Sequence, residues 1–139
     1  MRGRFADEIE RSNAMNKGEG VILLAHGSKN TEAEEELEEI AVQVRKELGE
    51  GRVILAFLQF NHPDLPEAIA GAAAEGLTRI VVVPFFLAPG VHVRKDIPAE
   101  LDQARVEYPG VEILLARPLL PDPRIGRILL DRIRAAPLG

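Results

Sequence analysis

Three histidines are the side chains of this sequence best suited to chemistry. Each follows a short apolar run: His26 comes directly after the first, His62 after the second, and His92 a few residues beyond the third. A neutral imidazole binds divalent transition metals and, with an ordinary pKa of about 6.5, also accepts a proton near neutral pH. The histidines are therefore candidate metal ligands and candidate bases.

The 139 residues include no cysteine, which excludes thiolate nucleophiles, iron–sulfur clusters and thiolate zinc sites. Imidazoles without thiolates suit cobalt, nickel, iron or zinc, and the sequence does not choose among these metals. The acidic stretch 32–39 is an alternative cation site, for calcium or magnesium. It lies on the polar side of a predicted helix, however, which is typical of a solvated face.

The overall composition limits the kinds of molecule that this protein is expected to bind. A net charge of -5 and an aromatic content of 4% disfavour nucleic acid as a partner. No apolar run approaches the ~20 residues of a membrane-spanning helix, and the first residues do not resemble a signal peptide, so we expect no membrane contact and a cytoplasmic protein. The sequence has no glycine-rich phosphate loop, and we expect no organic cofactor.

Short apolar runs alternate with helical periodicity along the chain. Strands are expected at 21–25, 53–60, 79–86 and 111–116, and helices at 31–48, at 65–75, from about Asp96 to before Pro109, and around 125–133. This alternation predicts an α/β fold: a single doubly wound domain with a four-stranded parallel sheet and helices on both faces. We expect residues 1–19 to form a poorly ordered tail and residues 20–139 to form the domain.

The predicted topology places the histidines at one edge of the sheet. Ligands of open parallel sheets bind outside the carboxyl ends of the strands, where all three histidines fall. Beside His26, Gly27 leaves space for a large ligand to approach. Ser28 next to His26 also allows a hydrolase, but no nucleophile-elbow pattern surrounds it, and a capping role for Ser28 is the alternative. For His62 the alternative is a simple turn before Pro63.

Two basic residues follow His92. Arg94 and Lys95 come at the predicted start of a helix, where positive charge opposes the helix dipole. This placement suggests an anion nearby, and the alternative is a pair of solvated basic side chains.

Three segments together resemble the small sirohydrochlorin chelatases, which are class II chelatases of the cobalamin, siroheme and nickel-tetrapyrrole pathways. The segments are 21–28 (VILLAHGS), 56–68 (AFLQFNHPDLPEA) and 80–98 (IVVVPFFLAPGVHVRKDIP), and the third is the most specific. The resemblance implies ATP-independent insertion of a divalent metal, cobalt first and nickel or iron next, into sirohydrochlorin. It further implies a homodimer of single-domain subunits in which His26 and His92 bind the metal.

The sequence departs from the family pattern after the second strand. Gln59 stands where the family usually has a glutamate, and His62 stands where a glutamate is also common. We hypothesise that His62 compensates as a third nitrogen ligand or base. If Gln59 disables the chemistry instead, the protein is a metal or tetrapyrrole carrier without turnover. Ser28, Gln59, Arg94 and Lys95 are the predicted substrate-binding residues, with the two basic residues facing the carboxylates of the macrocycle.

Overall fold

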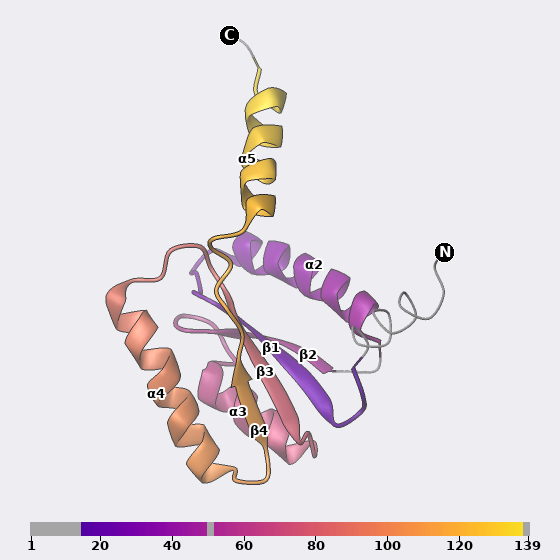
Figure 1. Ribbon diagram of the computed structural model, residues 1–139, viewed down its shortest axis with the longest axis vertical. Coiled ribbons are helices and arrows are strands. Elements are labelled where there is room, and N and C mark those ends of the chain that lie inside the picture. The colour runs from indigo at the N-terminus through magenta and orange to yellow at the C-terminus, as the bar shows by residue number, and fades with distance from the viewer. Residues whose placement is uncertain (1–14, 50–51, 138–139) are drawn as a thin grey trace.

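The computed structural model describes residues 15–49 and 52–137. Its strands are β1 (Glu19–Ala25), β2 (Arg52–Phe57), β3 (Arg79–Phe85) and β4 (Glu112–Leu115), and its helices are α2 (Thr31–Leu48), α3 (Leu65–Ala74), α4 (Val91–Glu107) and α5 (Pro123–Ala135). Strands and helices alternate along the chain (Figure 1). The strands are parallel and lie in the order β2-β1-β3-β4, which confirms the predicted α/β fold.

The strand at the centre of the sheet is apolar on both faces because both faces are covered. Residues 20–25 of β1 are all buried. The register pairs Ala25 with Phe57 of β2 on one side and with Phe85 of β3 on the other. Three strands therefore end at the same level, and the loops that follow them share one edge of the sheet.

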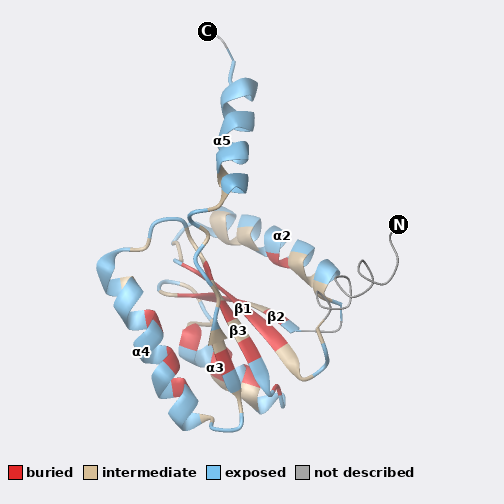
Figure 2. Ribbon diagram, viewed as in Figure 1, coloured by how far each residue is buried: buried red, intermediate tan, exposed pale blue. Residues whose placement is uncertain are grey.

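The helices cover the two faces of the sheet unequally. On one face, Ile69 of α3 and Leu101 of α4 are buried in the larger core cluster. On the other face, α2 contributes the fully buried Ala41 to a smaller cluster with β1 and β2. Helix α5 buries no residue, and it extends away from the sheet (Figures 1 and 2).

The second strand is shorter than its apolar run suggested. The prediction that it reaches Phe60 is wrong: β2 ends at Phe57, and Phe60 has a positive φ of 68°. The Phe57 amide donates to the Pro63 carbonyl and the Leu58 amide donates to the Ala25 carbonyl, so the chain turns at this point. The apolar residues beyond Phe57 belong to the loop at the carboxyl edge.

The prediction that the third helix begins at Asp96 is also wrong, because α4 begins at Val91. Proline usually marks the first turn of a helix, but here Pro98 lies inside α4. Val93 packs against the same core cluster as Ile97, one helical turn later, so packing of this apolar stripe extends the helix ahead of the proline.

Most of the predicted tail, residues 1–14, lies outside the described residues. Met15 bridges to Gly49, and β1 begins at Glu19. Within 15–49 and 52–137, no helix is both long enough and apolar enough to cross a membrane.

Candidate active site at the carboxyl edge of the sheet

His26 leaves the end of β1 at the centre of the edge and is exposed. Its backbone is tied to the loop after β2: the Leu58 amide donates to the Ala25 carbonyl at 2.9 Å, and the Gln59 amide donates to the His26 carbonyl at 3.2 Å. These two bonds continue the pairing of β1 with the chain after β2 beyond the ends of the strands. They hold His26 and Gln59, two predicted site residues, side by side.

Gly27 makes this contact between the loops possible. Its φ is +99°, a conformation that favours glycine, and a Cβ placed on it would lie 1.8 Å from the carbonyl oxygen of Gln59. Only glycine therefore fits at this position. The predicted role of Gly27, space for a ligand, differs from the structural one, which is close approach of two backbone segments.

Ser28 is held in the same loop by its backbone and its hydroxyl. The Ser28 amide donates to Asn61 Oδ1 at 2.7 Å, and Ser28 Oγ accepts from the Asn30 amide at 3.0 Å. Asn61 Nδ2 in turn donates to Glu34 Oε2 at 3.3 Å. Asn61 thus connects the loop after β2 with the loop after β1 and with α2. Its role was not predicted from the sequence, because an asparagine before His62 indicates only a turn.

The aromatic ring of Phe86 connects the His26 loop with the end of β3. The rings of His26 and Phe86 lie edge to face with centroids 6.4 Å apart. An open hollow of about 550 Å³ lies on the other side of His26, lined by Ser28, Leu37 and Phe85 among others. A second hollow of about 550 Å³ is lined by Phe86 and Arg94 among others. Both volumes are in the range of small-molecule sites.

His92 belongs to the first turn of α4 and not to a loop, and it is exposed. The N-cap is Gly90, so no side chain caps the helix, and the first turn has no acidic residue. Arg94 and Lys95 follow on the same helix, so positive side chains and the positive end of the helix dipole lie together. These positive charges favour a bound carboxylate near Arg94 and Lys95.

His62 is paired with a carboxylate. Its Nδ1 lies 2.7 Å from Glu67 Oε1, although the His62 side chain is 78% exposed. The hydrogen bond to Glu67 raises the pKa of His62, and the same bond lowers the pKa of Glu67. Glu67 Oε1 also accepts from the Asp64 amide at 3.2 Å, which completes the capping box of α3. The pairing of His62 with Glu67 was not predicted from the sequence.

The described residues bring His26, Ser28 and Gln59 together through hydrogen bonds, and they carry His92, Arg94 and Lys95 on one helical segment. In residues 15–49 and 52–137, no three histidine, aspartate or glutamate side chains gather closely enough to hold a metal ion.

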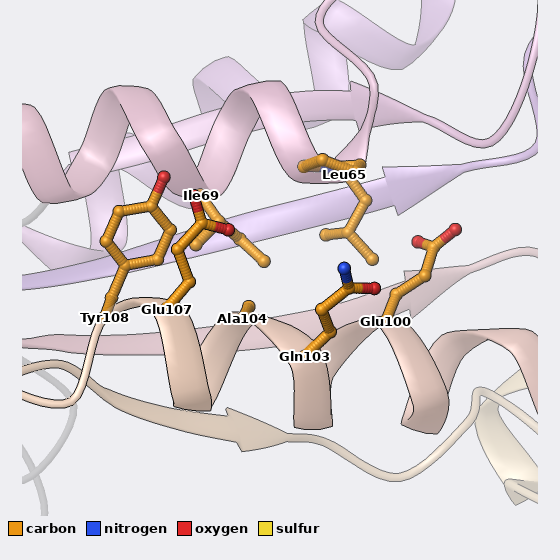
Figure 3. A pocket seen from close by; sticks show the side chains of 8 residues that line it. Leu65, Ile69, Glu100, Gln103, Ala104, Glu107 and Tyr108 are labelled. Atoms are coloured by element: carbon orange, nitrogen blue, oxygen red, sulfur yellow. The ribbon is translucent and has the colours of Figure 1, made fainter.

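A separate cavity between α3 and α4 is not part of this edge. It has a volume of about 120 Å³, and Ile69, Glu100 and Tyr108 are among its lining residues (Figure 3). Burial raises the pKa of Glu100, and the nearby Asp96 and Asp64 add to the effect. The cavity is too small for a macrocycle.

Comparison with known proteins defines the family. The CbiX family model matches residues 20–136. The sirohydrochlorin cobaltochelatase of Saccharolobus solfataricus is 39% identical over 122 residues, which cover 82% of this chain and 92% of the relative. The enzyme of the same name from Sulfurisphaera tokodaii is 37% identical over 114 residues, or 82% of this chain and 90% of the relative.

Solved structures agree with this relationship. A cobalamin biosynthesis CbiX protein from Marinobacter aquaeolei VT8 superposes with a TM-score of 0.70 at 34% identity, covering 84% of this chain and 94% of that chain. The sirohydrochlorin chelatase SirB of Bacillus subtilis, in complex with cobalt, shares the fold with a TM-score of 0.76 at 23% identity, covering 84% of this chain and 50% of SirB. The fold and the sequence define a chelatase-type α/β protein. The chain belongs to the CbiX family.

Proposed function

We propose that this protein inserts a divalent metal, with cobalt the first choice and nickel or iron next, into sirohydrochlorin without ATP. The observation that carries the proposal is the placement of His26 and His92. Both are exposed imidazoles, and they follow the neighbouring parallel strands β1 and β3 at the carboxyl edge of the sheet. Relatives of similar length that are named sirohydrochlorin cobaltochelatases support it.

In this proposal His26 and His92 hold the incoming ion, which is a substrate. Two imidazoles leave most coordination positions of a divalent ion for other ligands. The pyrrole nitrogens of the macrocycle can then replace the protein ligands one after another. Because the imidazoles are exposed, the ion can enter and leave the site without a large rearrangement.

Insertion also requires a base, because two pyrrole protons must leave as the metal binds. We assign this role in part to His62, whose Nδ1 is bound to Glu67 and whose Nε2 remains for proton exchange. A carboxylate behind an imidazole fixes its orientation and increases its basicity. This assignment keeps the hypothesis that His62 compensates for Gln59.

Recognition of the macrocycle is assigned to the residues around the ion. The carboxylates of sirohydrochlorin suit Arg94 and Lys95 at the first turns of α4. Ser28 and Gln59 would contact the macrocycle from the loops after β1 and β2. We also propose that the protein acts as a homodimer. The cytoplasmic location and the absence of an organic cofactor stay predictions from the sequence.

A second candidate function is a metal or tetrapyrrole carrier, which Gln59 favours because an amide cannot act as a carboxylate base or an anionic ligand. The two functions are separated by mixing sirohydrochlorin with Co²⁺, Ni²⁺ or Fe²⁺ and following the change in absorption with and without the protein. An enzyme accelerates insertion catalytically with at least one metal. Binding without acceleration for every metal would support the carrier and overturn the enzyme.

The role of His62 is tested by comparing His62→Ala and Gln59→Glu in the same assay. The proposal expects His62→Ala to slow insertion and Gln59→Glu to restore part of the rate in the His62→Ala background. An unchanged rate after the loss of His62 would remove the compensation hypothesis.

A further inference from the structure

Phe60 combines a strained backbone with an exposed aromatic ring. Its φ is +68°, and within residues 15–49 and 52–137 it is the one non-glycine residue with a positive φ. Phe60 is also 59% exposed. A bulky residue rarely adopts this left-handed conformation, and strain of this kind is concentrated at active sites and ligand clamps. Packing inside the protein does not account for a phenylalanine at this position, because the ring is exposed.

The turn that contains Phe60 is fixed to the loop that carries His26. The Gln59 amide donates to the His26 carbonyl at 3.2 Å, and the Asn61 amide donates to the Gln59 carbonyl at 2.9 Å. Asn61 Oδ1 also accepts from the Ser28 amide at 2.7 Å. The residues on both sides of Phe60 are therefore held against the candidate metal site, and Phe60 lies one residue from the contact with His26.

A lysine from the neighbouring loop lies over the Phe60 ring. Lys29 Nζ is 5.1 Å from the ring centroid, within the ~6 Å over which the face of an aromatic ring attracts a cation. Lys29 follows Ser28 in the loop after β1 and is exposed. Two loops thus bring an apolar ring and a positive charge together at the carboxyl edge, and both remain open to solvent.

The Lys29–Phe60 pair extends the candidate site across β1. Phe60 follows β2, Arg94 and Lys95 follow β3, and β1 lies between β2 and β3. His26, at the end of β1, therefore has the pair on its β2 side and the basic residues of α4 on its β3 side. A flat tetrapyrrole with carboxylates around its rim matches this arrangement, because it offers a conjugated face to the ring and anions to cations on both sides.

We propose that Phe60 and Lys29 form a platform for sirohydrochlorin, in which the Phe60 ring packs against the conjugated macrocycle and Lys29 binds one of its carboxylates. This inference rests on the proposed function, because it takes the same substrate, and it adds two binding residues to those assigned above. It also gives the strain at Phe60 a function: the fixed turn holds the ring outward for the ligand.

Two substitutions of Phe60 separate binding from folding. Asparagine tolerates a left-handed backbone but lacks the ring, whereas tyrosine keeps the ring. We expect Phe60→Asn to unfold at the wild-type urea concentration or above it. It should bind metal-free sirohydrochlorin about tenfold more weakly, since stacking of a flat conjugated ring on an aromatic side chain has an effect of this order. Phe60→Tyr should bind as wild type does. Titration followed by absorption of the macrocycle measures the binding.

The same variant has a defined signature in cobalt insertion. Phe60→Asn should raise the KM for sirohydrochlorin and leave kcat nearly unchanged, because the platform binds the substrate and takes no part in the proton transfer or in holding the metal. Val106→Asn is the matched control. Val106 on α4 is 82% exposed and lies in the last turns of that helix, away from the carboxyl edge, so this variant should keep the wild-type KM.

The role of Lys29 is tested through its charge. Lys29→Gln should weaken the binding of sirohydrochlorin about threefold at low salt and less at high salt, because an exposed ion pair is weak and is screened. Lys29→Arg should retain the affinity. Lys46→Gln, in the last turn of α2 and therefore at the opposite edge of the sheet, removes the same charge and should bind as wild type does.

Each result decides the inference. Wild-type affinity in Phe60→Asn, or equal losses in Phe60→Asn and Phe60→Tyr, overturns the platform and leaves the proposed reaction intact if wild type inserts cobalt. A lower urea midpoint than that of Val106→Asn makes Phe60 a structural residue, and a changed mass in solution makes it a contact between copies; either result also overturns the platform. If wild type binds sirohydrochlorin without accelerating insertion, the reaction fails and the binding data alone decide the platform.

Discussion

Replacing Gly27 by alanine tests how the loops at the carboxyl edge position His26. The added Cβ would lie 1.8 Å from the Gln59 carbonyl oxygen, so this oxygen must move by about 1.2 Å to reach the 3.0 Å that real Cβ atoms require. The left-handed φ of +99° adds about 1–2 kcal/mol for a residue with a side chain. Loss of the hydrogen bond between Gln59 and His26 adds about 1 kcal/mol.

We therefore expect Gly27→Ala to lower the free energy of unfolding by about 2–3 kcal/mol, measured by urea denaturation. We also expect it to slow cobalt insertion by roughly 100-fold, because a displacement of about 1 Å in a catalytic group has an effect of this size. Metal insertion into sirohydrochlorin, followed by absorption, measures the second effect.

Gly76→Ala is the matched control. Gly76 also has a positive φ, of +88°, but a Cβ there would meet nothing within 4 Å. It should lose only about 1–2 kcal/mol of stability and keep the wild-type insertion rate. The reasoning is refuted if Gly27→Ala loses no more stability than Gly76→Ala and inserts cobalt within about threefold of the wild-type rate.

The other predictions concern charge and packing. Proton NMR should find the pKa of His62 above the ordinary histidine value, and the Glu67→Gln substitution should bring this pKa back to the ordinary value. If the pKa of His62 does not change in Glu67→Gln, the 2.7 Å contact between His62 Nδ1 and Glu67 Oε1 is not formed. The raised pKa of His62 stabilises the folded protein fully below the ordinary histidine pKa, and this contribution is lost as the pH rises through the raised value. The lowered pKa of Glu67 stabilises the folded protein above the ordinary glutamate pKa, and this contribution is lost as the pH falls through the lowered value. Leu101→Ala, at a fully buried position, should cost about 2–5 kcal/mol of stability in urea, and a loss below 1 kcal/mol would contradict the packing of α4 on the sheet. Lys95→Gln should raise the KM for sirohydrochlorin with little change in kcat, and an unchanged KM would remove Lys95 from carboxylate recognition.

The fold could be predicted from the sequence because its signals are local. Buried parallel strands such as β1 are continuous apolar runs, and the helices between them have clear periodicity. The errors came where tertiary packing prevails over a local rule. Pro98 suggested a helix start, but contacts of Val93 with the core extend α4 to Val91.

The candidate site was predicted only in outline. The sequence shows that His26 and His92 each follow a strand, and in a parallel sheet the carboxyl ends of the strands lie at one edge. The placement of both histidines at this edge could therefore be predicted. The pair between His62 and Glu67, and the support of Ser28 by Asn61, could not be predicted because both depend on side-chain contacts across loops. Nor could the open position of α5 be anticipated, since its periodicity predicts a helix but not what the helix packs against.

The most direct measurement of the central claim is the rate of cobalt insertion into sirohydrochlorin by His26→Ala, His92→Ala and the double variant. If both imidazoles hold the same ion, each single variant falls close to the uncatalysed rate, and the double variant is no slower than either. A single variant that keeps the wild-type rate, or two moderate losses that multiply in the double variant, would contradict the claim that these two histidines act on one metal ion.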